Sequence, residues 1–255
     1  MKLTNAAALT AVLIGLAGTG AEAQTTFGAP PPSRGFISAN GIFQATGSSF
    51  TDRFDFQEFV EKGTIETEFE AKPAIGLDGS VGIRVWRNLG LGAGITTYAP
   101  GSRNDGGGTV TARIPHPLQF NQHREVSGEA GLRRKETAIH ASLLYFVPSR
   151  SKLQTIIGAG ASYFQAEQSF VNDVLYDHEY PFDTATFRGV DLDNESASGV
   201  GFNAMVDVGW RFSRSFGAGA VVRYTQGKLP FTPGDREVKV DVGGVQAGLG
   251  IRVIF

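Results

Sequence analysis

His140 and Ser142 come nearest in this sequence to a catalytic arrangement. Strand residues two apart point to the same face, so both would share a face with Glu136. A serine, a histidine and a carboxylate can together activate a hydroxyl nucleophile, as in a hydrolase acting on lipid. Any alternating strand places such neighbours on one face, however, and no nucleophile motif accompanies them. We therefore favour an interior hydrogen-bond network and expect no enzymatic activity.

Metal-ligating residue types are present but do not form a complete site. Asp191, Asp193 and Glu195 have a spacing that could collect a hard cation through oxygen ligands. The rest of a calcium-binding loop is missing, so a solvated acidic loop is the favoured interpretation. His116 and His123 have no cysteine or carboxylate at ligand spacing. We expect neither a metal nor another cofactor.

The stretch 245–255 has the clearest strand pattern among the elements that would position these residues. Apolar residues alternate along this stretch with small or polar residues. This alternation predicts a strand with one apolar face and one polar face. A soluble edge strand should be short, charged or covered, so an unbroken apolar face ending on an aromatic residue indicates contact with lipid. The apolar positions are Val245, Ala247, Leu249, Ile251, Val253 and Phe255.

The ending of this strand recurs earlier in the chain. Gly82–Trp86, Gly209–Phe212 and Gly250–Phe255 each place an arginine beside an aromatic terminus. The first two are followed by a tight polar turn and a glycine-rich strand, which indicates an internal repeat of hairpins. The aromatic residues expected at a lipid–water interface are Tyr145, Trp210, Phe212 and Phe255.

Residues 1–23 have the features of a secretory signal peptide, with Lys2, an apolar run and a small-x-small cleavage site at Ala21–Ala23. A proline-rich leader, residues 24–34, should follow. The chain has no cysteine, so the exported protein must be stabilised by its backbone network rather than by disulfides. Its formal net charge of −2 at pH 7 gives no bias toward nucleic acid.

Alternating residues predict about eight strands: 35–45, 65–85, 89–98, 134–147, 153–170, 200–212, 215–225 and 245–255. The second strand is longer than the ~9–11 residues that cross a bilayer. Pro73 within it has no backbone N–H to donate to a neighbouring strand, so we expect a weak point or bulge there. Long loops are predicted at 47–63, 100–129 and 171–198, and a shorter one at 230–237.

Long connections therefore alternate with tight turns. This order predicts a single domain, residues 35–255, that is an eight-stranded antiparallel transmembrane β-barrel with short periplasmic turns and long extracellular loops. A soluble ligand-binding barrel would instead place its apolar residues inside.

The signal peptide, the turn from Arg84 to Gly90, the glycine-rich amphipathic strands and the terminal Phe255 resemble the small outer-membrane β-barrel proteins of the OmpA, OmpX and OmpW type. The resemblance implies a location in the outer membrane of a Gram-negative cell envelope. It also implies insertion by the barrel assembly machinery, which recognises a C-terminal strand ending in an aromatic residue, here 245–255. The resemblance is one of pattern and implies no activity.

Five charged residues are predicted to face the barrel interior: Arg84, Glu136, Asp207, Arg211 and Arg252. Charges away from water must be paired, because an isolated buried ion is costly. The favoured interpretation is a salt-bridged plug that locks the barrel. The alternative is a charged constriction that lines a narrow pore.

We expect a structural or surface-interaction role through the long loops, with outer-membrane lipids, lipopolysaccharide and an undefined surface ligand as partners. Acids of the loop 171–198 could act through divalent ions that bridge to lipopolysaccharide. A narrow porin-like conduit for small or hydrophobic solutes, implied by the OmpW-like resemblance, is the alternative, and a lipid-modifying enzyme is a remote one. The surface-interaction role and the conduit differ in whether the barrel lumen is continuous.

Overall fold

The computed structural model describes residues 33–45, 49–70, 72–98, 106–149, 151–234 and 236–255. The predicted signal peptide and most of the predicted leader lie outside these residues. Within them, no helix is long and apolar enough to cross a membrane.

Eight antiparallel strands close into a barrel in the order β1-β12-β11-β10-β9-β8-β5-β4. Their bounds are β1 (Gly35–Gln44), β4 (Ala74–Trp86), β5 (Leu89–Tyr98), β8 (Arg134–Phe146), β9 (Leu153–His178), β10 (Ala185–Arg211), β11 (Phe216–Phe231) and β12 (Val238–Ile254). The first and last strands pair from Phe36 opposite Ile254 to Gln44 opposite Gln246, which closes the ring. The predicted eight-stranded barrel is confirmed.

The outer face of the barrel is a belt of exposed apolar side chains. Every barrel strand contributes to it, for example through Ile37, Leu77, Leu91, Leu143, Ile157, Phe202, Val222 and Leu249. Leaving so much apolar surface in water would cost about 25 cal/mol per Å². The belt is therefore the lipid-facing surface of a transmembrane barrel.

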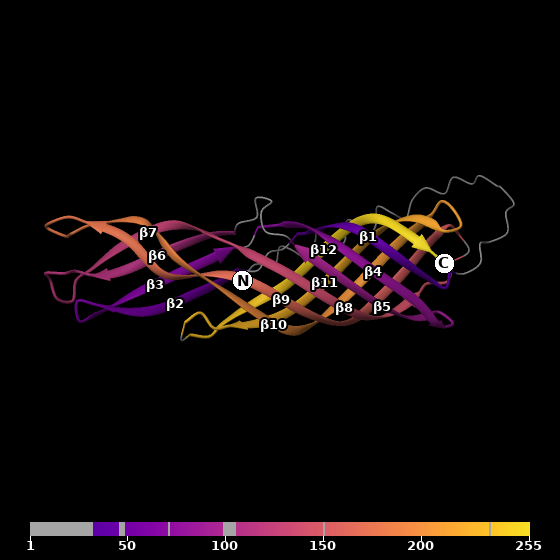
Figure 1. Ribbon diagram of the computed structural model, residues 1–255, viewed down its shortest axis with the longest axis horizontal. Helices are drawn as coiled ribbons and strands as arrows, with labels where there is room; N and C mark the ends of the chain where they lie inside the picture. Colours follow the sequence, from indigo (N-terminus) through magenta and orange to yellow (C-terminus); the bar gives the residue numbers. More distant parts are fainter. Residues whose placement is uncertain (1–32, 46–48, 71, 99–105, 150, 235) are drawn as a thin grey trace, which may run out of the picture.

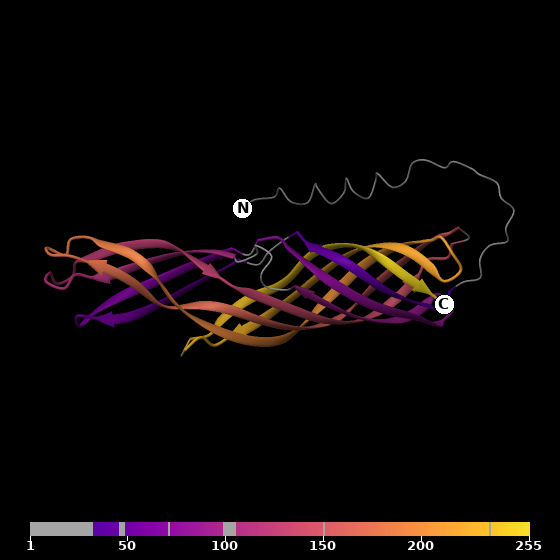
Figure 2. The same ribbon diagram turned by 45° about the horizontal axis from the view of Figure 1, so that its top comes forward.

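Four more strands form a second sheet in the order β2-β3-β6-β7. Their bounds are β2 (Ser49–Glu58), β3 (Glu61–Glu70), β6 (Gly106–Pro115) and β7 (His123–Leu132). Figure 1 shows this sheet at the end of the molecule opposite the C-terminus, with β9 and β10 running into it from the barrel. The turned view in Figure 2 shows the same end-to-end arrangement. We call this sheet, with residues 170–193 of the β9–β10 hairpin, the head.

An apolar core fills the head and continues into the adjoining part of the barrel, with contributions from the sheet, the β9–β10 hairpin, β8 and the outer ends of β11 and β12. Four phenylalanines form a chain of ring contacts through it. Phe50 lies 5.1 Å from Phe69 and 5.5 Å from Phe170, and Phe170 lies 5.3 Å from Phe231. Burying each such side chain contributes about 1.5–3 kcal/mol, so the head is a packed structure.

The head corrects the prediction of irregular loops. The connections are long, but 47–63 contains β2 and the start of β3, 100–129 contains β6 and most of β7, and 171–198 belongs to the β9–β10 hairpin. These segments alternate like strands and bury one face against each other. The expected weak point at Pro73 is confirmed, because the predicted strand 65–85 is divided there between β3 and β4.

Candidate functional site: the barrel interior and the distal tip of the head

Arg252 and Asp207 form a buried ion pair inside the barrel. The pair lies near the end where short turns join β4 to β5, β8 to β9 and β10 to β11, which we call the turn end. Arg252 Nη2 donates to both carboxylate oxygens of Asp207, and each residue is only 2% exposed. The Arg252 guanidinium also lies 4.3 Å above the ring of Phe36. Two of the predicted interior charges are thus brought together.

The other three predicted interior charges lie on β4, on β8 and at the end of β10. Arg84 stacks 4.7 Å above the Phe146 ring, and Arg211 is at the end of β10. Glu136 does not join them, because its Oε2 accepts from Arg134 Nη2 at 2.8 Å near the head. Phe146 belongs to an apolar layer that fills the turn end of the lumen together with Phe36, Leu144 and Ile156.

A second buried ion pair was missed by sequence reasoning. Arg223 Nη1 donates to Asp78 Oδ2 at 2.7 Å, and both side chains are almost fully buried. Asn40 Nδ2 donates to the other carboxylate oxygen at 2.9 Å. The alternation of β11 could have predicted the position of Arg223. Arg223 is an even number of residues from Gly217 and Gly219, so it faces the same inward side of the strand as they do.

His140 and Ser142 belong to a directed chain of hydrogen bonds that ends on the same carboxylate. Ser142 Oγ donates to Asn203 Oδ1 at 2.7 Å, and Asn203 Nδ2 donates to Ser162 Oγ at 2.9 Å. Ser162 Oγ lies 2.8 Å from His140 Nδ1, and His140 Nε2 lies 3.1 Å from Thr96 Oγ1.

The direction of this chain fixes the role of one nitrogen of the imidazole. Thr96 has a single hydroxyl proton, which it donates to Asp78 Oδ2 at 2.8 Å. His140 Nε2 must then donate to Thr96, while Nδ1 faces the Ser162 hydroxyl. The histidine contacts Ser162 rather than Ser142 and is 2% exposed. It lies within an interior hydrogen-bond network.

The space beside the buried histidine is small. A cavity of about 10 Å³ lies beside His140, Ser142 and Met205, which is about the room that one water needs. The interior consists of an apolar layer, a layer of paired charges and hydrogen-bonded polar groups, and then the head core. Buried side chains thus line the barrel interior from the turn end to the head.

Three hairpin turns meet at the far end of the head, as Figure 1 shows, and we call them the distal tip. They join β2 to β3, β6 to β7 and β9 to β10. Each presents large apolar side chains to solvent: Phe59 is 46% exposed, Val60 87%, Leu118 65%, Phe120 77% and Tyr180 80%. The charge pattern and ligand spacing of these segments do not indicate such residues, so the sequence did not predict them.

Polar contacts tie the three turns together. Asn121 N donates to Glu61 Oε1 at 2.6 Å, which joins the β6–β7 turn to the β2–β3 turn. His116 Nε2, from the β6–β7 turn, lies 3.7 Å from Asp183 Oδ1 of the β9–β10 turn. The tip is therefore a single surface rather than three independent loops.

Comparison with known proteins agrees with this architecture. The crystal structure of outer membrane protein OprG from Pseudomonas aeruginosa matches with a TM-score of 0.52 and 13% identity, over 88% of this chain and 96% of that chain. The chain has the fold of an outer-membrane β-barrel.

Two other solved structures have lower TM-scores. Neisserial surface protein A matches with a TM-score of 0.43 and 15% identity, over 88% of this chain and 98% of that chain. Ail, the attachment invasion locus protein of Yersinia pestis, matches with 0.39 and 12%, over 88% of this chain and 100% of that chain. No protein-family model matches the sequence, and no curated protein matches it.

The β2–β3 turn of this outer-membrane barrel is strained as well as apolar. Phe59 and Val60 have φ values of 49° and 68°, and they separate the paired residues Glu58 and Glu61. Two positive φ values in a two-residue loop define a type I′ turn, which favours Asn-Gly. A β-branched valine is unfavourable in that conformation, so the turn retains its apolar residues at a cost to stability.

A cleft of about 230 Å³ opens below this turn, between β2, β3, β6 and β9. Its floor includes the buried residues Ile65, Ile114 and Val174. At its rim Tyr176 Oη donates to both carboxylate oxygens of Glu58, at 2.8 and 2.9 Å. Burial, together with this hydrogen bond, raises the pKa of Tyr176, so the phenol remains a donor and holds β9 to β2.

The acidic stretch has a different form from the loop that was predicted. Asp191, Asp193 and Glu195 lie on β10, where the pairing with β9 shifts register after Asp191, and Asp191 and Asp193 are exposed. Within the part of the chain that the structure describes, no three His, Asp or Glu side chains are grouped so as to hold a metal ion.

The predicted interfacial and assembly residues lie on the outer wall. Tyr145, Trp210, Phe212 and Phe255 are all exposed near the turn end of the barrel. In β12 the alternate residues from Ala247 to Val253 also face outward, beside β1 and β11.

Proposed function

We propose that this outer-membrane barrel is a non-conducting, non-enzymatic surface protein that binds a partner protein through the distal tip of its head. The exposed apolar surface of the tip carries the proposal. Exposed apolar side chains are ordinary when scattered, but contiguous patches mark interaction sites. Phe59, Phe120 and Tyr180 are aromatic, and aromatic residues often anchor protein interfaces.

The charges around the tip indicate the chemistry of the partner. Glu179 and Asp183 are exposed in the β9–β10 turn, and Glu58 lies beside the β2–β3 turn. An apolar patch with an acidic rim favours a partner surface with apolar residues and basic neighbours. The cleft beneath the β2–β3 turn offers a place for one such apolar side chain.

The filled interior supports binding over transport. The alternative function, a narrow conduit for small or hydrophobic solutes, requires a path past two apolar layers and two buried ion pairs. A lipid-modifying enzyme would require a reactive group within reach of substrate, whereas His140 is buried and both its nitrogens have partners in hydrogen bonding.

The test replaces Phe59 and Val60 with Asn and Gly. Asn-Gly suits a type I′ turn, so the variant should be at least as stable as the wild type. It should nevertheless bind an alternating Phe-Lys peptide at least about tenfold more weakly, because aromatic anchors contribute about 2 kcal/mol or more. Binding is measured by calorimetry on the folded protein in detergent, and stability by thermal unfolding.

The control is Leu175→Ser, which removes an exposed apolar side chain from the side of the head. It should leave peptide binding unchanged. An alternating Phe-Glu peptide should bind poorly to every variant. Equal affinity for the two peptides, or an equal loss in the control, would contradict a specific site at the tip.

A further inference from the structure

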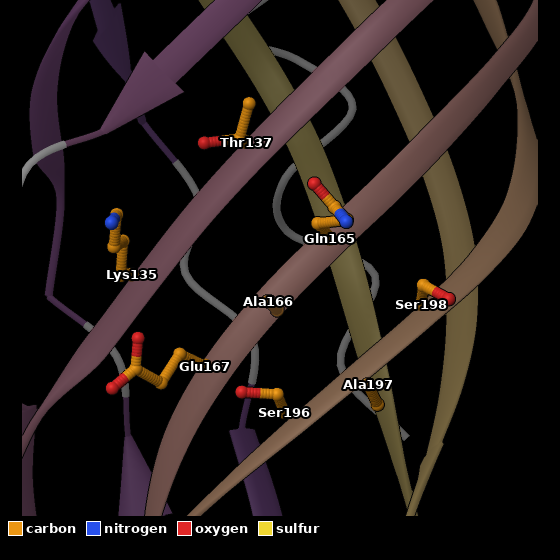
Figure 3. Close-up of a pocket in the computed structure, with 8 residues that line it drawn as sticks. All are labelled: Lys135, Thr137, Gln165, Ala166, Glu167, Ser196, Ala197 and Ser198. Atoms are coloured by element: carbon orange, nitrogen blue, oxygen red, sulfur yellow. The ribbon is translucent and has the colours of Figure 1, made fainter.

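A polar groove of about 340 Å³ lies on the barrel wall where it passes into the head. Figure 3 shows its side chains on three neighbouring strands, β8, β9 and β10. The polar residues that line it are Lys135, Thr137, Gln165, Glu167, Ser196 and Ser198. Their neighbours in sequence, such as Glu136 and Ala166, are buried on the inner side, so the groove faces outward.

Strand register places this groove directly above the apolar belt. Ile139, Tyr163 and Val200 lie opposite one another across the three strands, and all are exposed. The next row on the same face, two residues closer to the head, is polar and contains Thr137, Gln165 and Ser198.

The two rows are two residues apart, about 7 Å along a strand. Each headgroup layer of a bilayer is about 5–8 Å thick. The groove therefore lies at the depth of the outer-leaflet headgroups.

The groove contains one cation, Lys135, and one anion, Glu167. Lys135 lies opposite Glu167 in the register, yet none of the ion pairs found among the described residues involves Lys135 or the exposed Arg133 two residues before it. The Lys135 ammonium in the groove and the exposed Arg133 guanidinium two residues away can together bind a phosphate.

We propose that the groove binds the phosphorylated, hydroxyl-rich headgroup of an outer-leaflet lipid. Lys135 and Arg133 bind the phosphate. The hydroxyl groups of Thr137, Ser196 and Ser198 and the amide of Gln165 are matched to sugar oxygens. The acyl chains continue down the wall over the apolar row.

Glu167 makes the site selective for a headgroup over a bare anion. Its carboxylate accepts hydrogen bonds from the hydroxyl groups of a sugar headgroup. It repels a free phosphate ion, which has no such hydroxyl groups to offset the repulsion. Continuity with the apolar belt likewise favours a lipid over a soluble sugar phosphate.

The experiment uses the full mature protein, refolded in detergent and titrated with a bisphosphorylated diglucosamine lipid. The dephosphorylated lipid and inorganic phosphate are titrated in parallel. Native mass spectrometry counts the bound lipid, and circular dichroism checks that each variant is folded. Wild-type protein should bind the phosphorylated lipid at least about tenfold more tightly than the dephosphorylated one.

The double variant Arg133→Ala/Lys135→Ala should lose that preference. Lys152→Ala, which removes an exposed lysine at the opposite end of the barrel, should retain it. Equal binding of the two lipids by the wild type, or an equal loss in the Lys152 variant, would overturn the proposal. Competition by inorganic phosphate as effective as that by the lipid would overturn it too, since the site would then be one for free anions.

Discussion

Single side chains form two buried ion pairs in the barrel interior. Arg252 and Asp207 neutralise each other near the turn end, and Arg223 and Asp78 do so farther up. Strand phase predicts that Asp207 and Arg252 face inward, but it cannot select their partners. Glu136 shows this limit, because its counter-ion is Arg134, a near neighbour on the same strand.

Replacing Arg252 with Ala should destabilise the barrel by about 3–5 kcal/mol, because Asp207 would be left as an uncompensated buried charge. The double variant Arg252→Met/Asp207→Leu should recover most of that loss, since it removes both charges. Urea unfolding in lipid vesicles measures both changes. Equal midpoints for the single variant and the wild type would show that the pair does not lock the interior.

The strands of the barrel can be predicted from the sequence more completely than the strands of the head. Barrel strands such as β5 are predicted with their observed bounds because one whole face is apolar and lipid-facing. β2 also alternates, with Phe50, Phe54 and Phe56 on one face, but Asp52 interrupts that face. Its counter-ion is Arg236, in the distant β11–β12 turn, and a local pattern carries no sign of such a partner.

The packed head leads to a prediction for Phe170, which contacts both Phe50 and Phe231. Phe170→Ala should cost the head about 3–5 kcal/mol. Head strands should then become sensitive to protease on intact cells, while the membrane-spanning barrel stays resistant. Phe202→Ala, on the lipid-facing wall, is the control and should leave the head resistant. Equal resistance of wild type and Phe170→Ala would mean that the core does not hold the head together.

As a whole, the molecule is a barrel continued outward into a head. The class, the number of barrel strands and the closure of the ring follow from the sequence, because each depends on local alternation and loop order. The head does not, because its core is assembled from β2, β3, β6 and the β9–β10 hairpin, which are far apart in the chain. The apolar tip could have been noticed from Phe59-Val60 and Phe120, but only the fold brings these turns together.

The most direct test of a filled, non-conducting barrel is planar-bilayer conductance of the refolded mature protein, with an open porin as the positive control in the same chamber. We predict that membranes containing the folded protein show no steady conductance, because the apolar layer, the paired charges and the head core block the lumen in series. A reproducible, steady unitary conductance from the wild-type protein would contradict this account and favour a conduit.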